Sequence, residues 1–477
     1  MHVFSHLIHG QWVESTQTRA NINPSNLDHV IGHYAQADAA QVDQAVQAAR
    51  QAASVWSRST PQQRFDALDF IGTEILNRKQ ELGQLLAEEE GKILPEAIGE
   101  VTRAGFIFKY FAGEALRMAG QNMASVRPNM DVLTSREAVG VVALITPWNF
   151  PIAIPAWKTA PALACGNAVI LKPAELTPGC AWALAEIIQR APMPAGTFNL
   201  IMGDGVAGKA LVEHPQVDAI SFTGSVQTGK LIAQFCAGTS KKYQLEMGGK
   251  NPLIILDDAD LNNAVECAVN GAFFSTGQRC TANSRTIVSE KIYPAFLDAL
   301  LKRTRALKVG AAMASDSQIG PVVDANQLAK NLSYIKIAQE EGGTLLCGGE
   351  RLDGNGYFFS PAVIENSDTF ARINQEEVFG PVTSLMKVTD FDHAMQVANS
   401  TAFGLSAGIC TQSLKYATRF RNEIQAGMVM VNAPTAGVDY HVPFGGTKAS
   451  SFGPREQGNM ALEFYTRVKT HYIAALV

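Results

Sequence analysis

The spacing of apolar residues divides the chain into a helical region and an alternating region. Between Asp38 and Ala119 apolar residues recur at intervals of three and four, as Leu68, Ile71 and Ile75 do. This spacing is typical of helices that bury one face against a core. We therefore expect a layer of helices in the N-terminal quarter of the chain.

From residue 139 onward the pattern changes to short apolar runs that end in Gly, Pro or Asn, most of them followed by a helical segment. The expected strands are 140–145, 168–172, 198–202 and 219–222, and in a second series 252–256, 285–288, 383–388 and 428–431. Strands that alternate with helices favour parallel sheets covered by helices on both faces. The pattern thus predicts two α/β units.

Two strand-like segments, 123–135 and 464–477, fit neither series. Unpaired strand edges tend to find a partner. We expect these segments to pair with each other or with another subunit.

The composition favours a folded protein with a small-molecule partner. Of 477 residues, 47% are hydrophobic and 17% charged, below the roughly 25% charged residues of an average domain, so disorder is excluded. The 39 basic and 44 acidic residues leave a net charge of −5, with no basic run longer than two. The sequence therefore shows no cluster of basic residues of the kind that binds a nucleic acid or an anionic membrane.

The sequence also favours a cytoplasmic protein. Its longest apolar runs, such as 139–145, fall far short of the roughly 20 residues of a membrane helix, and the N-terminus lacks a secretory signal pattern. Seven cysteines without a C-x-x-C pair are expected to remain thiols in a reducing compartment. Asp257, Asp258 and Asp260 resemble a metal cluster, but their position before a predicted helix favours an N-cap and first-turn acids, and we predict no metal.

Cys280 differs from the other cysteines in its surroundings. It lies in GQRCTAN, between a predicted helix that ends near Phe274 and a strand that begins near Arg285, and the neighbouring Arg279 would favour its thiolate. A nucleophile and an ordinary loop cysteine are the two interpretations. The other six sit among small or apolar residues, as core thiols do: Cys165, Cys180, Cys236, Cys267, Cys347 and Cys410.

A nucleophile needs an oxyanion donor and a proton acceptor. Asn149, in TPWNFP at the end of a predicted strand, is a candidate donor, and the alternative is a turn residue that satisfies local backbone. Glu246, in LEMGGK between Leu245 and Met247, is a candidate base whose pKa burial would raise. Its alternative is a surface glutamate.

Two further segments suggest a nucleotide. In FTGSVQTGK, Gly224, Ser225 and Gly229 follow a predicted strand and open a helix, where backbone amides can bind a pyrophosphate. In LKPAE, Lys172 and Glu175 end another strand, where a nucleotide ribose can meet them. Ordinary surface residues are the alternative in both segments.

Together these motifs resemble the aldehyde dehydrogenase superfamily from about residue 10 to residue 469. PWNFP, KPAE, FTGS, LEMGGK, GQRC, EEVFGPV and PFGGTK occur in the superfamily's order, and Glu246 and Cys280 are 280 − 246 = 34 residues apart, as in its members. PWNFPIAIPAWKTAPALA, GAFFSTGQRCTANSR and SSFGPREQG are most similar to α-ketoglutaric semialdehyde (2,5-dioxovalerate) dehydrogenases. Succinic semialdehyde dehydrogenases are near neighbours.

The resemblance implies an α/β fold with a Rossmann-type nucleotide-binding domain, an α/β catalytic domain and a small β oligomerisation segment. The implied boundaries are 1–119 with 139–247 for the first, 248–446 for the second, and 120–138 with 463–477 for the third. A homo-oligomer, a tetramer or a dimer, is expected.

The resemblance also implies the site. Cys280 is the nucleophile, Glu246 the base for hydrolysis, Asn149 with the Cys280 amide the oxyanion hole, and Lys158 a supporting residue. The implied cofactor contacts are Thr146, Pro147, Trp148, Lys172, Glu175, Thr223, Gly224, Ser225, Gly229, Glu377 and Phe379. The implied substrate contacts are Phe150, Trp157, Phe274, Arg279, Thr281 and Phe444, where Arg279 alternatively forms a salt bridge that points away.

The implied activity is oxidation of an aldehyde to a carboxylic acid through a thiohemiacetal and a thioester on Cys280. NAD is the expected cofactor, with NADP as the alternative, because Glu175 would repel a 2′-phosphate. α-Ketoglutaric semialdehyde is the first candidate substrate, and succinic semialdehyde or another aldehyde the alternative. Rival functions are a cysteine hydrolase with His441 as base, an acylating enzyme that uses coenzyme A, and an inactive binding protein.

Overall fold

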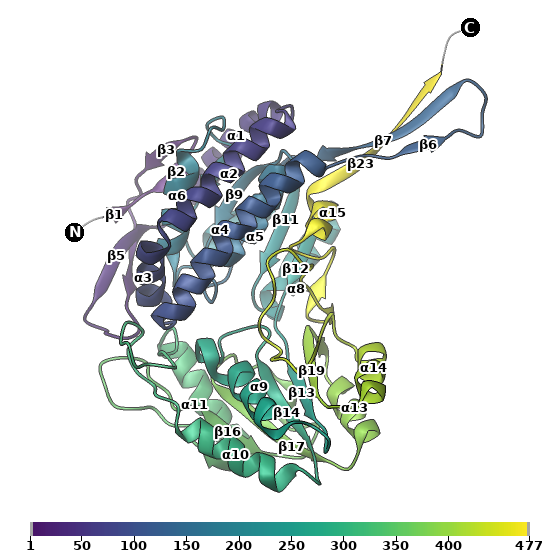
Figure 1. Cartoon of the computed structure of the whole chain (residues 1–477). Helices are drawn as coiled ribbons and strands as arrows, with labels where there is room; N and C mark the ends of the chain where they lie inside the picture. The colour runs from purple at the N-terminus through teal and green to yellow at the C-terminus, as the bar shows by residue number, and fades with distance from the viewer. Residues whose placement is uncertain (1–2, 475–477) are drawn as a thin grey trace.

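The structure, a computed structural model, describes residues 3–474 and is an α/β protein with two large sheets and a projecting arm (Figure 1). The predicted α/β class is confirmed. Every strand of the two predicted series is present, with ends within two residues of those expected. The predicted domain boundaries stay a prediction.

The expected layer of helices covers residues 39–117. Helix α1 begins with a capping box at Asp38, and α2 with one at Thr60 followed by Pro61 at the first helical position, the usual signals that start a helix. The helices of this layer are α1 (Ala39–Trp56), α2 (Pro61–Asn77), α3 (Lys79–Glu90) and α4 (Leu94–Arg117).

Helix α4 is held closely against α2. A Cβ at Gly72 would lie 2.8 Å from the carbonyl oxygen of Gly105, so both glycines are needed for the two backbones to approach. Val101, Phe108 and Phe111 of α4 are fully buried, and a Phe→Ala change in such a core typically costs about 3–5 kcal/mol. This packing fixes the rotation of α4 and therefore the direction of its remaining side chains.

The first large sheet has the order β22-β12-β11-β8-β9-β10-β2-β3. Its five central strands are parallel, whereas β22, β2 and β3 are antiparallel additions at the edges. The strands are β2 (His6–Ile8), β3 (Gln11–Val13), β8 (Val141–Ile145), β9 (Ala168–Lys172), β10 (Phe198–Leu200), β11 (Ala219–Thr223), β12 (Lys242–Glu246) and β22 (Ser451–Phe452). The sequence pattern did not predict β12, which ends at Glu246.

Helices connect these strands and cover the sheet (Figure 1). They are α5 (Ala153–Ala164), α6 (Pro178–Gln189), α7 (Gly205–Glu213) and α8 (Val226–Thr239). A separate three-stranded sheet near the N-terminus contains β1 (Val3–Phe4), β4 (Thr18–Ile22) and β5 (Val30–Ala35).

The second large sheet has the order β15-β16-β17-β14-β13-β19-β20, and all its pairs except β15 with β16 are parallel. Its strands are β13 (Asn251–Ile255), β14 (Asn283–Ser289), β15 (Thr344–Cys347), β16 (Ala362–Glu365), β17 (Val382–Val388), β19 (Ser406–Cys410) and β20 (Met428–Val431). Its helices are α9 (Leu261–Phe273), α10 (Tyr293–Arg305), α11 (Ala325–Glu340), α12 (Arg372–Gln375), α13 (Phe391–Asn399) and α14 (Leu414–Glu423). Asp260 caps α9 by accepting from the Asn263 amide at 2.9 Å, as predicted.

The arm confirms that the two strand-like segments pair with each other. Strands β7 (Met130–Ala138) and β23 (Thr466–Ala474) are antiparallel along their whole length, with β6 (Asn122–Ala124) beside β7. The prediction was wrong at Phe464 and Tyr465, which are buried in a short helix, α15 (Leu462–Tyr465), because their rings pack into the core. Residues 475–477 of the predicted segment lie outside the described residues.

Short elements complete the chain: η1 (Phe274–Gly277), β18 (Phe403–Gly404), β21 (Thr447–Lys448) and η2 (Asn459–Ala461). Within residues 3–474, no helix is both long and apolar enough to cross a membrane.

Candidate functional site

A cavity of about 200 Å³ lies between the two large sheets and brings together most of the predicted motifs. PWNFP reaches it after β8, FTGS after β11, and GQRC before β14. Nine predicted residues line it: Pro147, Trp148, Asn149, Thr223, Gly224, Ser225, Cys280, Glu377 and Phe379. Residues of both α/β units therefore share one site.

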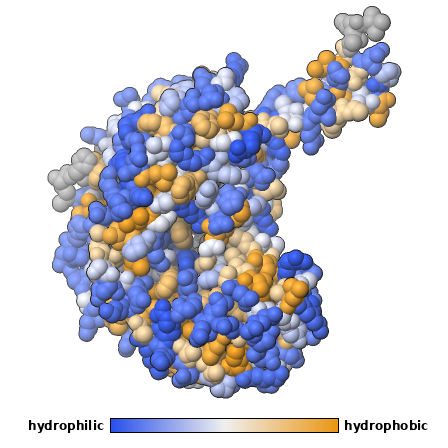
Figure 2. All heavy atoms as spheres, in the orientation of Figure 1, coloured by the Kyte–Doolittle hydropathy of each residue, from blue (hydrophilic) through white to orange (hydrophobic). Residues whose placement is uncertain are grey.

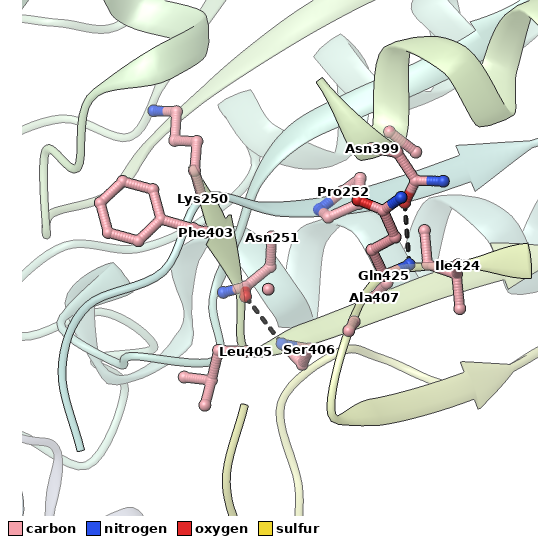
Figure 3. Close-up of a pocket in the computed structure, with 13 residues that line it drawn as sticks. Lys250, Asn251, Pro252, Asn399, Phe403, Leu405, Ser406, Ala407, Ile424 and Gln425 are labelled. Atoms are coloured by element: carbon pink, nitrogen blue, oxygen red, sulfur yellow. Dashed lines mark hydrogen bonds between the residues drawn. The ribbon is translucent and has the colours of Figure 1, made fainter. Parts of the chain in front are cut away.

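The loop that carries Cys280 is held in a strained form. Ser275 and Thr276, just before it, have φ of 51° and 55°, a left-handed backbone that costs on the order of 1–3 kcal/mol per residue outside glycine. Asn251 holds the other side: its amide donates to the carbonyls of Cys280 and Ala282, at 2.8 Å each. Its oxygen accepts from the Ser406 amide at 3.0 Å (Figure 3). The sequence motifs did not indicate a role for Asn251, although its position directly after LEMGGK was a signal that it belongs to the site.

Burial decides the protonation of Cys280. Burial is the largest cause, and together with the carboxylates of Glu377 and Glu246 it raises the pKa of the thiol to about 12, while the Arg103 guanidinium opposes the rise. The predicted charge attraction between Arg279 and a Cys280 thiolate is present, but burial outweighs it. The Arg279 guanidinium also donates to the carbonyls of Asn270 and Gly271, the latter at 3.3 Å, near the end of α9.

From the raised pKa of the Cys280 thiol we predict how its reactivity depends on pH. In the protein without ligands, the rate of Cys280 alkylation by iodoacetamide should rise about tenfold per pH unit from pH 7.5 to 9.5 without levelling, because the thiolate fraction grows tenfold per unit below the pKa. Mass spectrometry of the Cys280 peptide measures the rate, with Cys280→Ala as the blank. A plateau below pH 8.5 would contradict the assignment.

A buried ion pair positions Asn149. The Asn149 side-chain amide donates to the Gln278 backbone carbonyl at 2.9 Å, and the Asn149 backbone carbonyl accepts from the Lys92 ammonium at 2.9 Å. Lys92 pairs with Glu100 at 2.6 Å, and the other oxygen of Glu100 accepts two backbone amides at the start of α5, those of Ile152 (3.2 Å) and Ala153 (3.1 Å). Removing one partner of such a pair strongly destabilises a protein because it leaves a buried charge. The pair joins α4 to the loop that carries Asn149.

Glu246 is buried at the end of β12 but does not line the cavity. Its carboxylate accepts from the Ser451 hydroxyl at 2.5 Å, and a Cβ at Gly445 would collide with it, at 2.8 Å from Oε1. This contact explains a glycine of PFGGTK. Burial raises the pKa of Glu246 well above its usual value, and the nearby Glu456 adds to that shift, while Ser451 and Lys158 oppose it.

Lys158 supports the site through a second carboxylate. Its buried ammonium forms an ion pair with Glu456 and donates to the Ser221 hydroxyl at 2.7 Å. Glu456 also accepts from the Gln244 amide at 3.1 Å. Lys158 thus acts on Glu246 through charge rather than through the cavity. Glu456, which lies 298 residues further along the chain, was not predicted.

The carboxyl ends of the parallel strands present the nucleotide motifs. The Thr146 amide donates to the Lys172 carbonyl at 3.1 Å, which joins β8 to β9, and the Lys172 ammonium lies 3.7 Å from the Glu175 carboxylate. Ser225 caps α8 by accepting from Thr228. Within residues 3–474, no protein acceptor meets the amides of residues 225–227. A free helix N-terminus of this kind suits a pyrophosphate.

Two glycines of FTGSVQTGK play a different part from the one predicted. The Gly224 amide donates to the Glu246 carbonyl at 3.0 Å, and the Gly229 amide to the Ser225 carbonyl at 2.9 Å, so neither amide is free. A Cβ at Gly229 would lie 2.5 Å from the Met247 sulfur. Gly229 therefore lets α8 pack closely.

The far side of the cavity has a buried carboxylate and an aromatic pair. Glu377 accepts from the Gly249 amide at 2.9 Å. Phe379 has a positive φ of 63° and meets Trp148 edge-to-face, with 5.4 Å between ring centroids. Lys330 of α11 also lines the cavity, although the sequence did not indicate it. A helix N-terminus, a carboxylate for ribose hydroxyls and a flat aromatic wall together fit a dinucleotide.

The predicted substrate residues divide into two groups. Phe444 belongs to the same apolar cluster as Cys280, and Trp157 lies beside Phe444 at 5.3 Å between centroids. Three of the others have contacts with the rest of the protein. Phe150 lies under the Lys92 ammonium at 3.9 Å, Phe274 packs on the core of the second sheet, and the Thr281 carbonyl accepts from Thr435 at 2.8 Å.

His441 is not placed to act on Cys280. It is exposed, does not line the cavity, and its ring lies 5.4 Å from that of Tyr440. The structure therefore gives no support to a hydrolase that uses Cys280 with His441.

Comparisons with known proteins agree over nearly the whole chain. The sequence profile of the Aldehyde dehydrogenase family matches residues 12–471. The α-ketoglutaric semialdehyde dehydrogenase of Bacillus subtilis is 43% identical over 98% of both chains, and the α-ketoglutarate semialdehyde dehydrogenase of Haloferax volcanii is equally similar. The crystal structure of betaine aldehyde dehydrogenase from Staphylococcus aureus in complex with NAD+ has a TM-score of 0.96 and 37% identity, covering 98% of this chain and 95% of that one.

Proposed function

The chain belongs to the aldehyde dehydrogenase family, and from this premise we propose that it oxidises α-ketoglutaric semialdehyde to 2-oxoglutarate with Cys280, Asn149 and Glu246 as catalytic residues. It is an NAD-dependent aldehyde dehydrogenase. The observation that carries the catalytic proposal is the shared cavity that sets Cys280 beside Asn149, Ser225 and Glu377. The assignment of the substrate is based on the two relatives of 43% identity, which are named α-ketoglutaric or α-ketoglutarate semialdehyde dehydrogenase.

In the first step the Cys280 sulfur attacks the aldehyde carbon. The thiol gives its proton to water, a C–S bond forms, and the π electron pair of the carbonyl moves to oxygen. The Asn149 side chain and the Cys280 backbone amide donate to that oxygen, where negative charge develops. Asn149 now donates to the Gln278 carbonyl, so its second N–H is the one offered to the substrate.

The cofactor would be held by residues that line the cavity and by residues at the carboxyl ends of the parallel strands. We assign Lys172 and Glu175 to the adenosine ribose, the amides around Ser225 to the pyrophosphate, and Glu377 with Phe379 to the nicotinamide ribose. When bound, the nicotinamide supplies the hydride acceptor that turns the thiohemiacetal into a thioester. The protein contributes position and electrostatics.

In the last step Glu246 takes a proton from water. The hydroxide adds to the thioester carbon, the C–S bond breaks, and the acid leaves while Cys280 regains a proton. To reach this water, Glu246 would have to leave its contact with the Ser451 hydroxyl. Its raised pKa suits a proton acceptor. Burial and the Glu456 carboxylate raise that pKa, and the Lys158 ammonium opposes the rise.

The function is tested by a panel of aldehydes with both cofactors. We expect NADH formation with α-ketoglutaric semialdehyde at a kcat/KM at least tenfold above that for pentanal, hexanal or benzaldehyde. NAD should be preferred to NADP because the Glu175 carboxylate would repel a 2′-phosphate. Equal or better rates with the uncharged aldehydes would overturn the substrate, and absence of reduced cofactor with every aldehyde would overturn the catalytic assignment.

We also propose that the arm joins copies of the chain into a tetramer or a dimer. The arm extends beyond the main body (Figure 2), and its exposed apolar side chains include Val468, Tyr472 and Ile473, each more than half exposed. Exposed apolar strands of this kind favour packing against a partner. Light scattering that gave 51.2 kDa, the mass of one chain, would contradict the proposal.

We place the protein in the cytoplasm. All seven cysteines are free thiols, and Cys267 lies within hydrogen-bonding range of Cys410 without a disulfide. Free thiols persist in a reducing compartment. Recovery of the native protein in a secreted or periplasmic fraction would rule this out.

A further inference from the structure

Three side chains from distant parts of the chain form a group of hydrogen-bond donors beside the catalytic cysteine. We call Arg103, Trp157 and Gln457 the distal donor cluster. The Arg103 guanidinium, from α4, lies over the Trp157 ring at 5.6 Å from its centroid. It also donates to the Gln457 side-chain oxygen at 3.0 Å. Trp157 and Gln457 are buried, at 4% and 0% exposed.

The cluster has more donors than acceptors. Three of its nitrogens are buried without a hydrogen-bond partner in the described part of the chain: Arg103 Nε, Trp157 Nε1 and Gln457 Nε2. Buried donors are normally satisfied, and three unpaired ones on side chains that meet at one guanidinium indicate a place where an acceptor binds. Because one of them belongs to a cation, that acceptor should be an anion.

No protein carboxylate fills this role. The charges of Glu100, Asp439 and the Cys280 thiolate raise the pKa of Arg103. Within residues 3–474, however, no acid forms an ion pair with its guanidinium. Glu100 is already paired with Lys92 at 2.6 Å, and Asp439 is exposed. The guanidinium is therefore a half-buried cation without a protein counter-ion.

The Phe444 ring lies between the distal donor cluster and the Cys280 nucleophile. Trp157 packs on Phe444 at 5.3 Å, and Phe444 packs in the same apolar cluster as Cys280. Arg103 is also close enough to lower the pKa of the Cys280 thiol against the larger effect of burial. A short-chain aldehyde bound at Cys280 would thus pass the aromatic pair with its far end directed toward Arg103.

We propose that the distal donor cluster binds the carboxylate of the substrate, with the Arg103 fork and the Gln457 and Trp157 N–H groups as donors. This inference rests on the proposed function and assigns its substrate specificity to residues of α4, α5 and the segment before η2. Arg103 thereby takes the part that the resemblance gave to Arg279, one terminal nitrogen of which donates to the carbonyls of Asn270 and Gly271 near the end of α9.

The test compares two substrates of the same chain length, α-ketoglutaric semialdehyde and pentanal. In Arg103→Gln, kcat/KM for the semialdehyde acid should fall about 10- to 150-fold, mainly through KM, the range expected for lost hydrogen bonds to a charged group. For pentanal it should stay within threefold. Arg103→Lys should recover part of the loss. Arg279→Gln is the matched control and should affect both substrates equally.

A second variant keeps the test valid if Arg103→Gln does not fold. Gln457→Glu preserves the shape and supplies Arg103 with a carboxylate, so it should also depress the semialdehyde acid and spare pentanal. Binding of 2-oxoglutarate to Cys280→Ala, measured by calorimetry, should weaken at least tenfold when Arg103→Gln is added. Equal losses of kcat/KM for both substrates, or unchanged binding of 2-oxoglutarate, would contradict the proposal that the distal donor cluster binds the substrate carboxylate. A wild type that prefers pentanal would instead overturn the proposed substrate.

Discussion

Glu246→Gln is expected to release a burst of about one NADH per active site and then turn over about 10² to 10⁴ times more slowly than the wild type. The substitution keeps the volume and the contact with Ser451 but removes the proton acceptor. A thioester on Cys280 is stable to neutral water on the turnover timescale, so the acyl-enzyme should accumulate. Stopped-flow absorbance with saturating aldehyde and NAD measures both phases.

The location of the accumulated group provides the control. Mass spectrometry of the quenched Glu246→Gln protein should find the acyl group on the peptide that contains Cys280, and Cys280→Ala should show neither burst nor turnover. Turnover of Glu246→Gln at the wild-type rate would remove Glu246 from the mechanism. A slow variant without a burst would move Glu246 to an earlier step, the removal of the thiol proton.

Asn149→Ala is expected to lower kcat by about 10² to 10³, the usual loss of one oxyanion donor. Asn149 lines the cavity beside Cys280 and is held in place by Lys92 and by the Gln278 carbonyl. Its amide is therefore preorganised and need not be ordered during the reaction. Steady-state kinetics measure the loss, which should appear in kcat and kcat/KM together.

The controls for Asn149 separate catalysis from folding. Asn149→Asp keeps the size but places a negative charge beside the developing oxyanion, so its loss should be at least as large as that of Asn149→Ala. NADH binding, followed by fluorescence, should remain within threefold of the wild type in both variants. A variant that binds NADH normally and retains its kcat would show that another donor stabilises the oxyanion.

The pKa values of the two reacting groups share one cause. Burial raises the pKa of both the Cys280 thiol and the Glu246 carboxyl, because charge is costly to hold away from water. Both groups are thus favoured in their neutral forms while the site is at rest. Nearby cations, Arg103 for Cys280 and Lys158 with Arg455 for Glu246, oppose this effect but are smaller than burial.

The sequence by itself determined the order of the elements and the chemistry available at their ends. The spacing of three and four between apolar residues, and the short apolar runs that end in Gly, Pro or Asn, depend on backbone geometry that is local. The same locality holds for the N-caps, such as Asp260, and for motifs in which Cys280 or Asn149 follows a strand or a helix. The resemblance to a known family then assigned roles that no local pattern implies.

Only the tertiary structure decided which side chains meet. Lys158 with Glu456, and Arg103 with Gln457, are pairs separated by 298 and 354 residues, and no spacing along the chain predicts them. Arg279 is adjacent to Cys280 in sequence but turns to carbonyls of α9, whereas Arg103 is 177 positions away, by 280 − 103, and lowers the thiol pKa. The physical reason is that the direction of a side chain follows from how its helix or loop packs against the rest of the protein, and that packing is a property of the whole core.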